Sequence, residues 1–542
     1  MKKIFLLLSS ILASLLLTEF FFFGAASGLG YTILFVGFAA LSYLLLGTPK
    51  GGKRHKVEHF FLLAVIVLLA VPFFLFDNWT IKMLLFFVLL GLIPAFYLHN
   101  SASDKLTWKS FLFLGELFVG FFARPFACIG SSMKIVFRKK SAPAQEAVPQ
   151  EMPQGTAPSE TMQQRPGAFN VYNGSMPPQM AKPSHTKKPI LMQVIIGLVI
   201  ACPLLLFLLV ILASADPLFA DFVTQSIAFI RNIQITKYFF HVLFAVLILP
   251  FLLSWMWSFK KPMVFFDYEA EALKAGKKRT TMPDVVAITV LSSVNLLYLA
   301  YAAVQFVYVV GVAWAGTLPG GIEPAVYART GFFELSFLAV LNLIMLVVSA
   351  RFTGRDGVSG RVISFLSVLM TMLSLIQLVS AAIRMFVYVE TFGLSRMRLF
   401  VLAFLFLLGA LFLLLILREF IRKLSAFVPI TVITLVFLVV FSFMSPDRVI
   451  AEFNIAQAEA GYTEELDLDY LLYELSDDSR IVLFRNLERL EALDTDFAVQ
   501  LKTYARREWS PEWGWNFESL KGLNVSHLRL QQIIGEKYDF SV

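Results

Sequence analysis

The chain has 542 residues, of which 58% are hydrophobic and only 15% are charged. Soluble globular proteins are usually about 45–50% apolar and about 25% charged, so this composition excludes an ordinary soluble protein. The net charge of +8 is uneven: residues 446–542 contain 19 acidic and 10 basic residues, and the rest contains 19 acidic and 36 basic residues. Because the cytoplasmic loops of membrane proteins are rich in Lys and Arg, a basic membrane body does not indicate nucleic acid as a partner.

Apolar runs of membrane-crossing length recur along the whole chain. A span needs about 20 mostly apolar residues, and roughly eleven such runs are present. They lie at 4–24, 31–47, 59–76, 81–98, 190–213, 238–257, 284–312, 332–350, 362–383, 399–417 and 427–444. Unbroken runs favour helices over the short alternating strands of a barrel. The predicted fold class is all-α: a polytopic transmembrane helical bundle with a small helical extramembrane C-terminal domain.

Residues 1–140 are expected to form N-terminal transmembrane helices followed by an interfacial segment. Lys2 and Lys3 precede an apolar run without a clear cleavage site, which we interpret as an uncleaved first span with a cytoplasmic N-terminus. Basic residues flank the segment 106–129 on both sides, and its apolar sequence is interrupted by Lys109, Glu116, Arg124 and Pro125. This pattern predicts an interfacial or re-entrant helix.

Residues 141–188 differ sharply in composition from their neighbours. Eight prolines lie there among Gln, Ala, Met and Ser, and such a segment cannot bury a core. We interpret it as a disordered, Pro/Gln-rich cytoplasmic linker. The alternative is that it binds a partner through a polyproline II segment.

The main transmembrane domain is expected at 189–445, and one charged segment stands out within it. Arg384, Glu390, Arg396 and Arg398 lie between the apolar runs at 362–383 and 399–417. Loop charges place this segment near the outer surface, where arginines are exceptions to the positive-inside rule. Charges beside spans mark a surface turn or a functional site. The alternative is that the arginines extend to lipid phosphates.

Residues 446–542 are expected to form an acidic, helical, extracytoplasmic C-terminal domain. Apolar residues recur there at helical spacing from Tyr470 to Leu493. Ser476, followed by Asp477 and Asp478, predicts a helix start. One stripe then contains Leu483, Leu487, Leu490 and Leu493. A cluster of tryptophans either packs this domain or rests it on the membrane interface: Trp509, Trp513 and Trp515.

Three separated segments carry a family resemblance. They are 214–221, then 384–398, then 454–455 with 466–471 and 475–478. In this order they resemble the bacterial membrane family catalogued as domain-of-unknown-function 4173, related to the 4153 group, over roughly 190–490. The resemblance implies a bacterial inner-membrane protein and brings no activity. The ligand-binding or functional candidates are Asp216, Pro217, Arg384, Tyr388, Glu390, Gly393, Arg396 and Arg398.

Asp216 and Pro217 have a simpler interpretation as a helix end followed by a turn. The six histidines are scattered along the sequence, and neither H-E-x-x-H nor G-x-S-x-G occurs. We therefore predict no catalytic residue, no metal site and no cofactor. Several polar residues lie in or near spans, where they either bond between helices or line a transport path: Glu19, Asn295, Gln305, Glu334, Asn342 and Gln377.

Three function classes remain open. We favour a non-enzymatic scaffold or sensor in the cell envelope, with the lipid bilayer and an envelope protein or anionic lipid as partners. The second class is a transporter or lipid flippase that uses intramembrane polar residues, although no internal repeat is visible. The third is a membrane enzyme acting on a lipid-linked substrate, whose phosphates would suit the arginine cluster.

Overall fold

The computed structural model describes residues 2–22, 28–47, 52–101, 112–137, 237–260, 283–315, 332–353, 357–421, 427–461, 467–493, 495–508 and 520–537, with nine positions between 205 and 225. The chain divides into two compact units, Met1–Phe137 with His241–Val542, and Arg138–Phe240. All secondary structure in these described ranges is helical, which confirms the all-α fold class. The expected linker and the tryptophan cluster lie outside the described residues.

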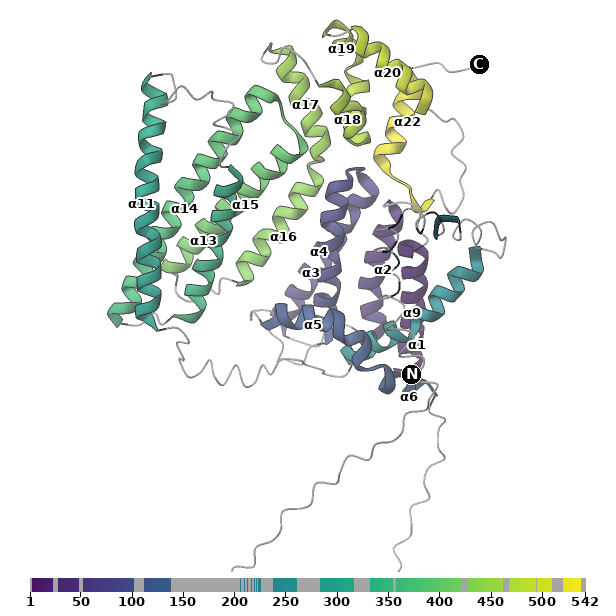
Figure 1. Ribbon diagram of the computed structural model, residues 1–542. Coiled ribbons are helices and arrows are strands. Elements are labelled where there is room, and N and C mark those ends of the chain that lie inside the picture. Colours follow the sequence, from purple (N-terminus) through teal and green to yellow (C-terminus); the bar gives the residue numbers. More distant parts are fainter. Residues whose placement is uncertain are drawn as a thin grey trace, which may run out of the picture. The chain divides into compact units, whose positions relative to one another are not determined.

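The first unit begins with four apolar helices (Figure 1). α1 (Lys2–Leu17) continues into the short π-helix η1 (Thr18–Phe22), and α2 (Leu29–Leu46), α3 (Lys53–Leu75) and α4 (Trp79–Ser101) follow. A short turn containing Asp77 and Asn78 joins α3 to α4, so these two helices form an antiparallel hairpin. Buried side chains from α2, α3 and α4 form one core, among them Leu34, Ile66 and Leu89.

Three further helices accompany this group. α9 (Lys237–Lys260) runs antiparallel to α1, since Ser14 Oγ donates to the Ala245 carbonyl at 2.5 Å and Ser10 Oγ approaches Met256 Sδ at 3.6 Å. The expected interfacial segment at 106–129 contains α5 (Leu112–Ala127) and the start of α6 (Ile129–Phe137). α5 has 16 residues and is not one of the helices long enough to span a membrane.

A second group consists of α11 (Asp284–Ala315), α13 (Phe332–Phe352), α14 (Gly357–Phe392) and α15 (Arg396–Phe420). These helices share a separate core, and α16 (Phe427–Phe443) contributes Leu435 and Phe441 to the first one. α14 has 36 residues because neither Gly nor Pro occurs between Gly360 and Gly393. At 1.5 Å per residue it is about 54 Å long, whereas a bilayer core is about 30 Å thick.

The length of α14 changes the interpretation of the charged segment. We expected a turn from 384 to 398, but residues 384–392 continue α14 and the turn itself is only 393–395. The helix continues because its sequence contains no breaker before Gly393. Arg384, Tyr388 and Glu390 therefore lie on the last turns of a helix that is longer than the membrane.

The C-terminal part forms a small helical domain. It consists of α17 (Pro446–Glu459), the short π-helix η2 (Tyr470–Glu474), α18 (Asp477–Arg485), α19 (Leu487–Leu493), α20 (Thr495–Glu508) and α22 (Val525–Lys537). The predicted helix start is confirmed, because Ser476 is the N-cap of α18. Leu483, Leu487 and Leu490 of the predicted stripe are buried in a core that also includes Met385, Val389 and Leu394 from the ends of α14 and α15.

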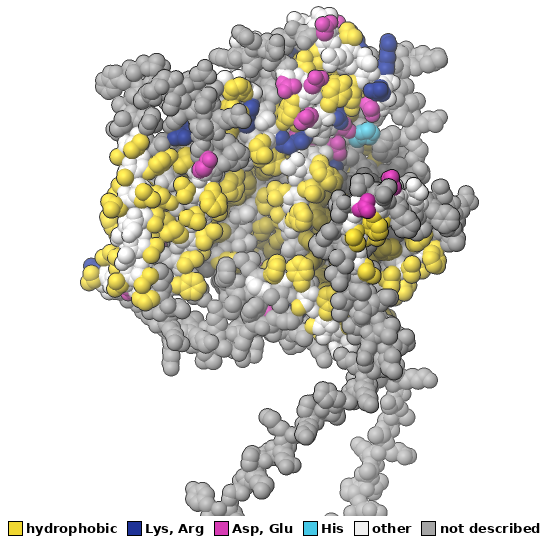
Figure 2. All heavy atoms as spheres, in the orientation of Figure 1, with side chains coloured by type: hydrophobic (Ala, Val, Ile, Leu, Met, Phe, Trp, Pro, Cys, Tyr) yellow, Lys and Arg dark blue, Asp and Glu magenta, His cyan; other side chains and the backbone are white. Residues whose placement is uncertain are grey.

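Eight described helices are long and apolar enough to cross a membrane, and a ninth results if α16 and α17, bent by 58°, count as one span. The apolar helix Glu334–Ala350 is shorter, and the run predicted at 190–213 lies mostly outside the described residues. In Figure 2, hydrophobic side chains cover α11 and α13–α16, whereas charged side chains gather over the C-terminal helices. Large apolar side chains on these helices are exposed, among them Phe406 of α15 by 74% and Phe337 of α13 by 68%. Large apolar side chains facing outward are expected where lipid is the solvent.

Candidate functional site

The turn between α14 and α15 is held by a side chain from the C-terminal domain. Gly393 has a φ of +72°, a backbone conformation that residues with a Cβ rarely adopt. The side chain of Asn454, on α17, forms hydrogen bonds with both backbone polar groups of Leu394, the residue after Gly393. Its Oδ1 accepts from the Leu394 amide at 2.7 Å, and its Nδ2 donates to the Leu394 carbonyl at 2.8 Å. A Cβ on Gly393 would lie 3.0 Å from Asn454 Oδ1, so both φ and space require glycine here.

Asp447, in the first turn of α17, is fully buried and accepts four hydrogen bonds. Arg396 donates from Nε at 3.0 Å and from Nη2 at 2.8 Å, so this ion pair is bidentate. Asn78 Nδ2 donates at 2.6 Å from the α3–α4 turn, and the Ser476 amide donates at 3.0 Å from the start of α18. One carboxylate thus joins two turns of the bundle to two helices of the C-terminal domain.

Arg398 stabilises the end of α14. Its Nη1 donates to the Phe392 carbonyl at 2.7 Å and also to the Gly393 carbonyl. Its guanidinium lies 4.2 Å from the centre of the Tyr388 ring, a cation–π contact. The last carbonyls of a helix have no partner within the helix, so Arg398 acts as a C-terminal cap.

Asp478 forms a second contact between the domain and the α3–α4 turn. Its Oδ2 accepts from the Asp77 amide at 3.0 Å, and its Oδ1 accepts from the Ser526 hydroxyl. Burial raises the pKa of Asp478 to about 6, and the nearby carboxylates of Asp447 and Asp77 act in the same direction. Ser526 Oγ also lies 3.0 Å from the Leu75 carbonyl, and its single hydrogen is shared between these two acceptors, so α22 contacts the end of α3 directly.

The pKa of the adjacent carboxyl, Asp477, is shifted in the opposite direction. Burial alone would raise its pKa, but a hydrogen bond from His527 (Nδ1 to Oδ2, 2.7 Å) and the charge of Arg480 (Nη1 to Oδ1, 2.5 Å) outweigh burial and lower it. The hydrogen bond to Asp477 raises the pKa of His527. Two neighbouring acids in one helix therefore have pKa values shifted in opposite directions.

A third contact fixes the segment before α22 to the ends of α1 and α2. Lys521 has a side chain only 1% exposed and forms an ion pair with Glu19, which is also 3.0 Å from His241 Nδ1. The Leu29 amide donates to the Leu523 carbonyl at 3.0 Å. A Cβ on Gly28 would lie 2.6 Å from backbone atoms of Gly522 and Leu523, so this close approach requires glycine. Glu19, one of the polar residues singled out in the spans, thus binds the C-terminal domain.

We call this set of contacts the junction, defined by Glu19, Asp77, Asn78, Gly393, Arg396, Asp447, Asn454, Asp478, Lys521 and Ser526. Four of the predicted candidates lie in or beside it, namely Tyr388, Gly393, Arg396 and Arg398. Arg384 is buried in α14 and Glu390 is exposed near the end of that helix. Asp216 is exposed in the second unit, where its amide donates to the Leu212 carbonyl at 3.1 Å, as at a helix end. Pro217 lies outside the described residues.

The sequence interpretation missed the acceptor side of the junction. Asp447 follows Ser445 and Pro446, a pattern that predicts a helix start, and nothing local indicates that its carboxylate is buried. Asn78 lies in a short polar turn that reads as an ordinary loop. A usable signal was the excess of arginines near the expected outer surface, because such charges require partners.

Polar residues within the second helix group bond to neighbouring helices. The Tyr298 hydroxyl donates to Asn342 Oδ1 at 2.5 Å, and Asn342 Nδ2 donates to Ser374 Oγ at 2.9 Å, which connects α11, α13 and α14. Asn295 Nδ2 donates to the Leu366 carbonyl at 3.0 Å. These contacts match the first of the two interpretations given above, hydrogen bonding between helices.

Three of the histidines that are scattered in sequence lie together in space. The rings of His55 and His99 stack at 4.1 Å, and His59 stacks on His99 at 5.9 Å. His59 Nε2 is 2.9 Å from the Tyr43 hydroxyl. Within the described ranges no group of three or more His, Cys, Asp or Glu side chains has a geometry suited to a metal ion. The stack therefore joins α3 to α4 and, through Tyr43, to α2.

These helices and contacts define an integral membrane protein of the polytopic helical class, with a C-terminal helical domain bonded to its bundle. The family described as "Domain of unknown function (DUF4153)" matches residues 63–486, and the chain belongs to that family. The predicted link to the 4153 group is thus confirmed, whereas the narrower 4173 assignment stays a prediction. Neither a curated protein nor a solved structure matches the chain.

Proposed function

We propose that the protein is a non-enzymatic scaffold or sensor of the bacterial inner membrane, whose C-terminal domain holds a fixed position on the membrane bundle. The observation that carries the proposal is Asp447, which bonds Asn78, Arg396 and Ser476 at once. A buried carboxylate with four directional donors permits few arrangements of the segments that bear them. Binding of a partner or signal to the C-terminal domain would then act directly on the ends of the transmembrane helices.

Charge along α3 supports a cytoplasmic N-terminus and an extracytoplasmic domain. The N-terminal end of α3 carries Lys53, Arg54 and Lys56, whereas its C-terminal end contacts the domain through Leu75. Basic ends of spans face the cytoplasm. The junction then lies on the outer side of the membrane, where envelope components are accessible.

A pocket with more arginines than carboxyls supports an anionic partner. It has a volume of about 510 Å³, and its lining includes Phe443 and Met444 at the exposed end of α16. Its charged lining residues are Arg448, Arg485 and Arg529 against Glu452 and Asp478. Arg448 pairs with Glu452 at 2.8 Å. Within the described part of the chain, neither Arg485 nor Arg529 forms an ion pair. Guanidinium groups beside exposed apolar side chains at the end of a span suit a lipid phosphate, and a carboxylate of an envelope protein is the alternative.

A lipid transporter or flippase is the second candidate, because the bundle contains an apolar cavity of about 500 Å³. An enzyme acting on a lipid-linked substrate would need arginines available for its phosphates. Arg396 is engaged by Asp447, and Arg398 by the end of α14. The enzyme alternative therefore loses two of the arginines that the sequence suggested for its phosphates.

Photo-crosslinking in cells tests the scaffold or sensor role. A photoreactive amino acid is placed at Tyr473 or Val499, exposed by 57% and 56% on the C-terminal domain, with the lipid-facing position Phe406 as control. We expect one defined adduct from the domain positions that is absent at Phe406 and is lost when Arg396→Met disrupts the junction. Equal adducts at all positions would contradict the proposal. The proposal would also be contradicted if Glu390→Gln abolished transport of a lipid or solute while the protein level stayed normal.

Cysteine labelling tests the orientation. In a background with Cys128→Ser and Cys202→Ser, an impermeant maleimide should label Val499→Cys from outside intact cells, and Ser159→Cys only after lysis. The reverse pattern would place the domain in the cytoplasm and would exclude an envelope partner.

A further inference from the structure

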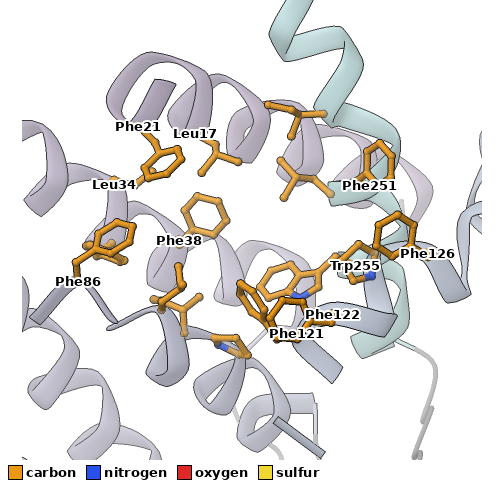
Figure 3. Close-up of a pocket in the computed structure, with 17 residues that line it drawn as sticks. Leu17, Phe21, Leu34, Phe38, Phe86, Phe121, Phe122, Phe126, Phe251 and Trp255 are labelled. Carbon is orange, nitrogen blue, oxygen red and sulfur yellow. The ribbon is translucent and has the colours of Figure 1, made fainter. Parts of the chain in front are cut away.

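The cavity in the first unit is bounded by α1, η1, α2, α4, α5 and α9 (Figure 3). Its volume of about 500 Å³ lies in the usual range of ligand pockets, about 300–1,000 Å³. Each of its 17 lining residues is apolar, and they include eight phenylalanines and Trp255. A buried water needs two to four polar partners, so this lining does not suit water.

The cavity extends along two of the helices that bound it. On α4 its lining residues recur at helical spacing from Phe86 to Pro94, and on α9 from Ile248 to Trp255. Eight residues of helix correspond to about 12 Å at 1.5 Å per residue. An extended chain of methylene groups fits along this length.

The depth of the cavity follows from exposure. Leu34, Phe38 and Trp255 are less than 10% exposed and form its interior. Phe122 and Phe126 of α5, exposed by 59% and 51%, also line it and form its rim. Because α1, α2, α4 and α9 are candidate spans, the medium outside this rim at membrane depth is hydrocarbon.

We infer that this cavity binds one hydrocarbon chain of a membrane lipid, with the chain aligned along α4 and α9 and entering past α5. Dispersion and aromatic contacts hold the chain, and no polar group of the lipid is required inside. The inference depends on the membrane location of the helices and is independent of the scaffold or sensor role. Its failure would leave the crosslinking experiment at Tyr473 and Val499 unaffected.

The test uses the full chain reconstituted in vesicles that contain a phospholipid with a diazirine near the end of one acyl chain. After irradiation, labelled peptides are mapped by mass spectrometry. We expect labelling concentrated on the cavity side of α4 and α9. Leu34→Trp or Leu252→Trp, each of which narrows the cavity, should lower it several-fold, because a bulky side chain obstructs the path of the hydrocarbon chain. Leu296→Trp, at a position of α11 that is 71% exposed, is the matched control and should leave it unchanged.

Competition in the unmodified protein gives a second measurement that does not depend on how the variants fold. An unlabelled phospholipid or a polyprenyl phosphate is added at increasing mole fraction. Selective loss of cavity labelling by either lipid supports the proposal and identifies the chain as acyl or isoprenoid. Labelling that is equal on α11 and in the cavity, and that neither competitor lowers selectively, would overturn it.

Discussion

Arg396 and Asp447 lie 51 positions apart in sequence and form a bidentate ion pair with distances of 3.0 and 2.8 Å. Asp447 is completely buried, whereas a quarter of the Arg396 side chain is exposed. A buried charge is tolerated when a partner charge and additional donors surround it. Asn78 and the Ser476 amide supply those donors, so this pair organises the contact between the bundle and the C-terminal domain.

Loss of the guanidinium should therefore be costly. We expect Arg396→Met to destabilise the domain contact by about 3–5 kcal/mol, because it leaves Asp447 buried without its partner charge. Arg448→Met is the matched control, since Arg448 forms a largely exposed pair with Glu452 that contributes about 0–1 kcal/mol. The measurement is the apparent Tm in lipid nanodiscs. Asp447→Asn should partly restore the Tm of Arg396→Met, and equal Tm values for the two single arginine variants would contradict the role of the pair.

The turn at Gly393 offers a test that separates backbone strain from contact. Gly393→Ala should lower the Tm more than Gly461→Ala. Both glycines have positive φ, +72° and +73°, and an L-residue there costs about 1–2 kcal/mol. Of the two, Gly393 is the one whose new Cβ lies close to another group, 3.0 Å from Asn454 Oδ1, whereas no atom of the described residues lies within 4 Å at Gly461. Combining Gly393→Ala with Asn454→Ala should give less than the sum of the two effects, and strict additivity would show that they act separately.

The sequence predicted most of the fold. Runs of Phe, Leu and Val longer than any soluble helix needs identify the spans from composition alone, and Ser476 marks the start of α18 by its local chemistry. Of the junction, the sequence indicated the arginine side and not the residues that accept from it. Arg396 and Arg398 could be singled out because basic residues near the outer surface are exceptions to the positive-inside rule. Asp447 and Asn78, in contrast, resemble ordinary helix-start and turn residues. Their burial depends on contacts between segments hundreds of residues apart, which no local pattern encodes.

The raised pKa of Asp478 predicts that the domain contact weakens as pH rises. Since its pKa is about 6 in the folded chain against 3.8 for an ordinary Asp, the protonated form is favoured on folding. This contribution is fully present below pH 3.8 and is lost as pH rises through about 6; a shift of about two pKa units corresponds to about 3 kcal/mol. The raised pKa of His527 acts in the same direction, at higher pH.

Asp478→Asn isolates the contribution of this carboxyl. The amide oxygen can accept from the Asp77 amide, and the new NH₂ group can donate to Ser526 Oγ, so the contacts are retained without the charge. Between pH 5 and 8, where Asp477 stays ionised because its pKa is lowered, the Tm should fall in the parent protein and change less in the variant. Parallel curves for the two proteins would show that Asp478 does not titrate in this range.

Lys521 should control how firmly the segment before α22 contacts the ends of α1 and α2. Its ammonium is buried against Glu19, and Leu523, two residues later, is 9% exposed and bonded through its carbonyl to Leu29. In the cysteine-free background, Leu523→Cys should react slowly with a maleimide in nanodiscs. Lys521→Met should accelerate labelling because Glu19 then loses its buried partner, and Glu19→Gln should act in the same direction. Lys537→Met, at the exposed end of α22, is the control. A labelling rate that the Lys521 and Glu19 substitutions leave unchanged would show that the backbone contact between Leu29 and Leu523 suffices without the ion pair.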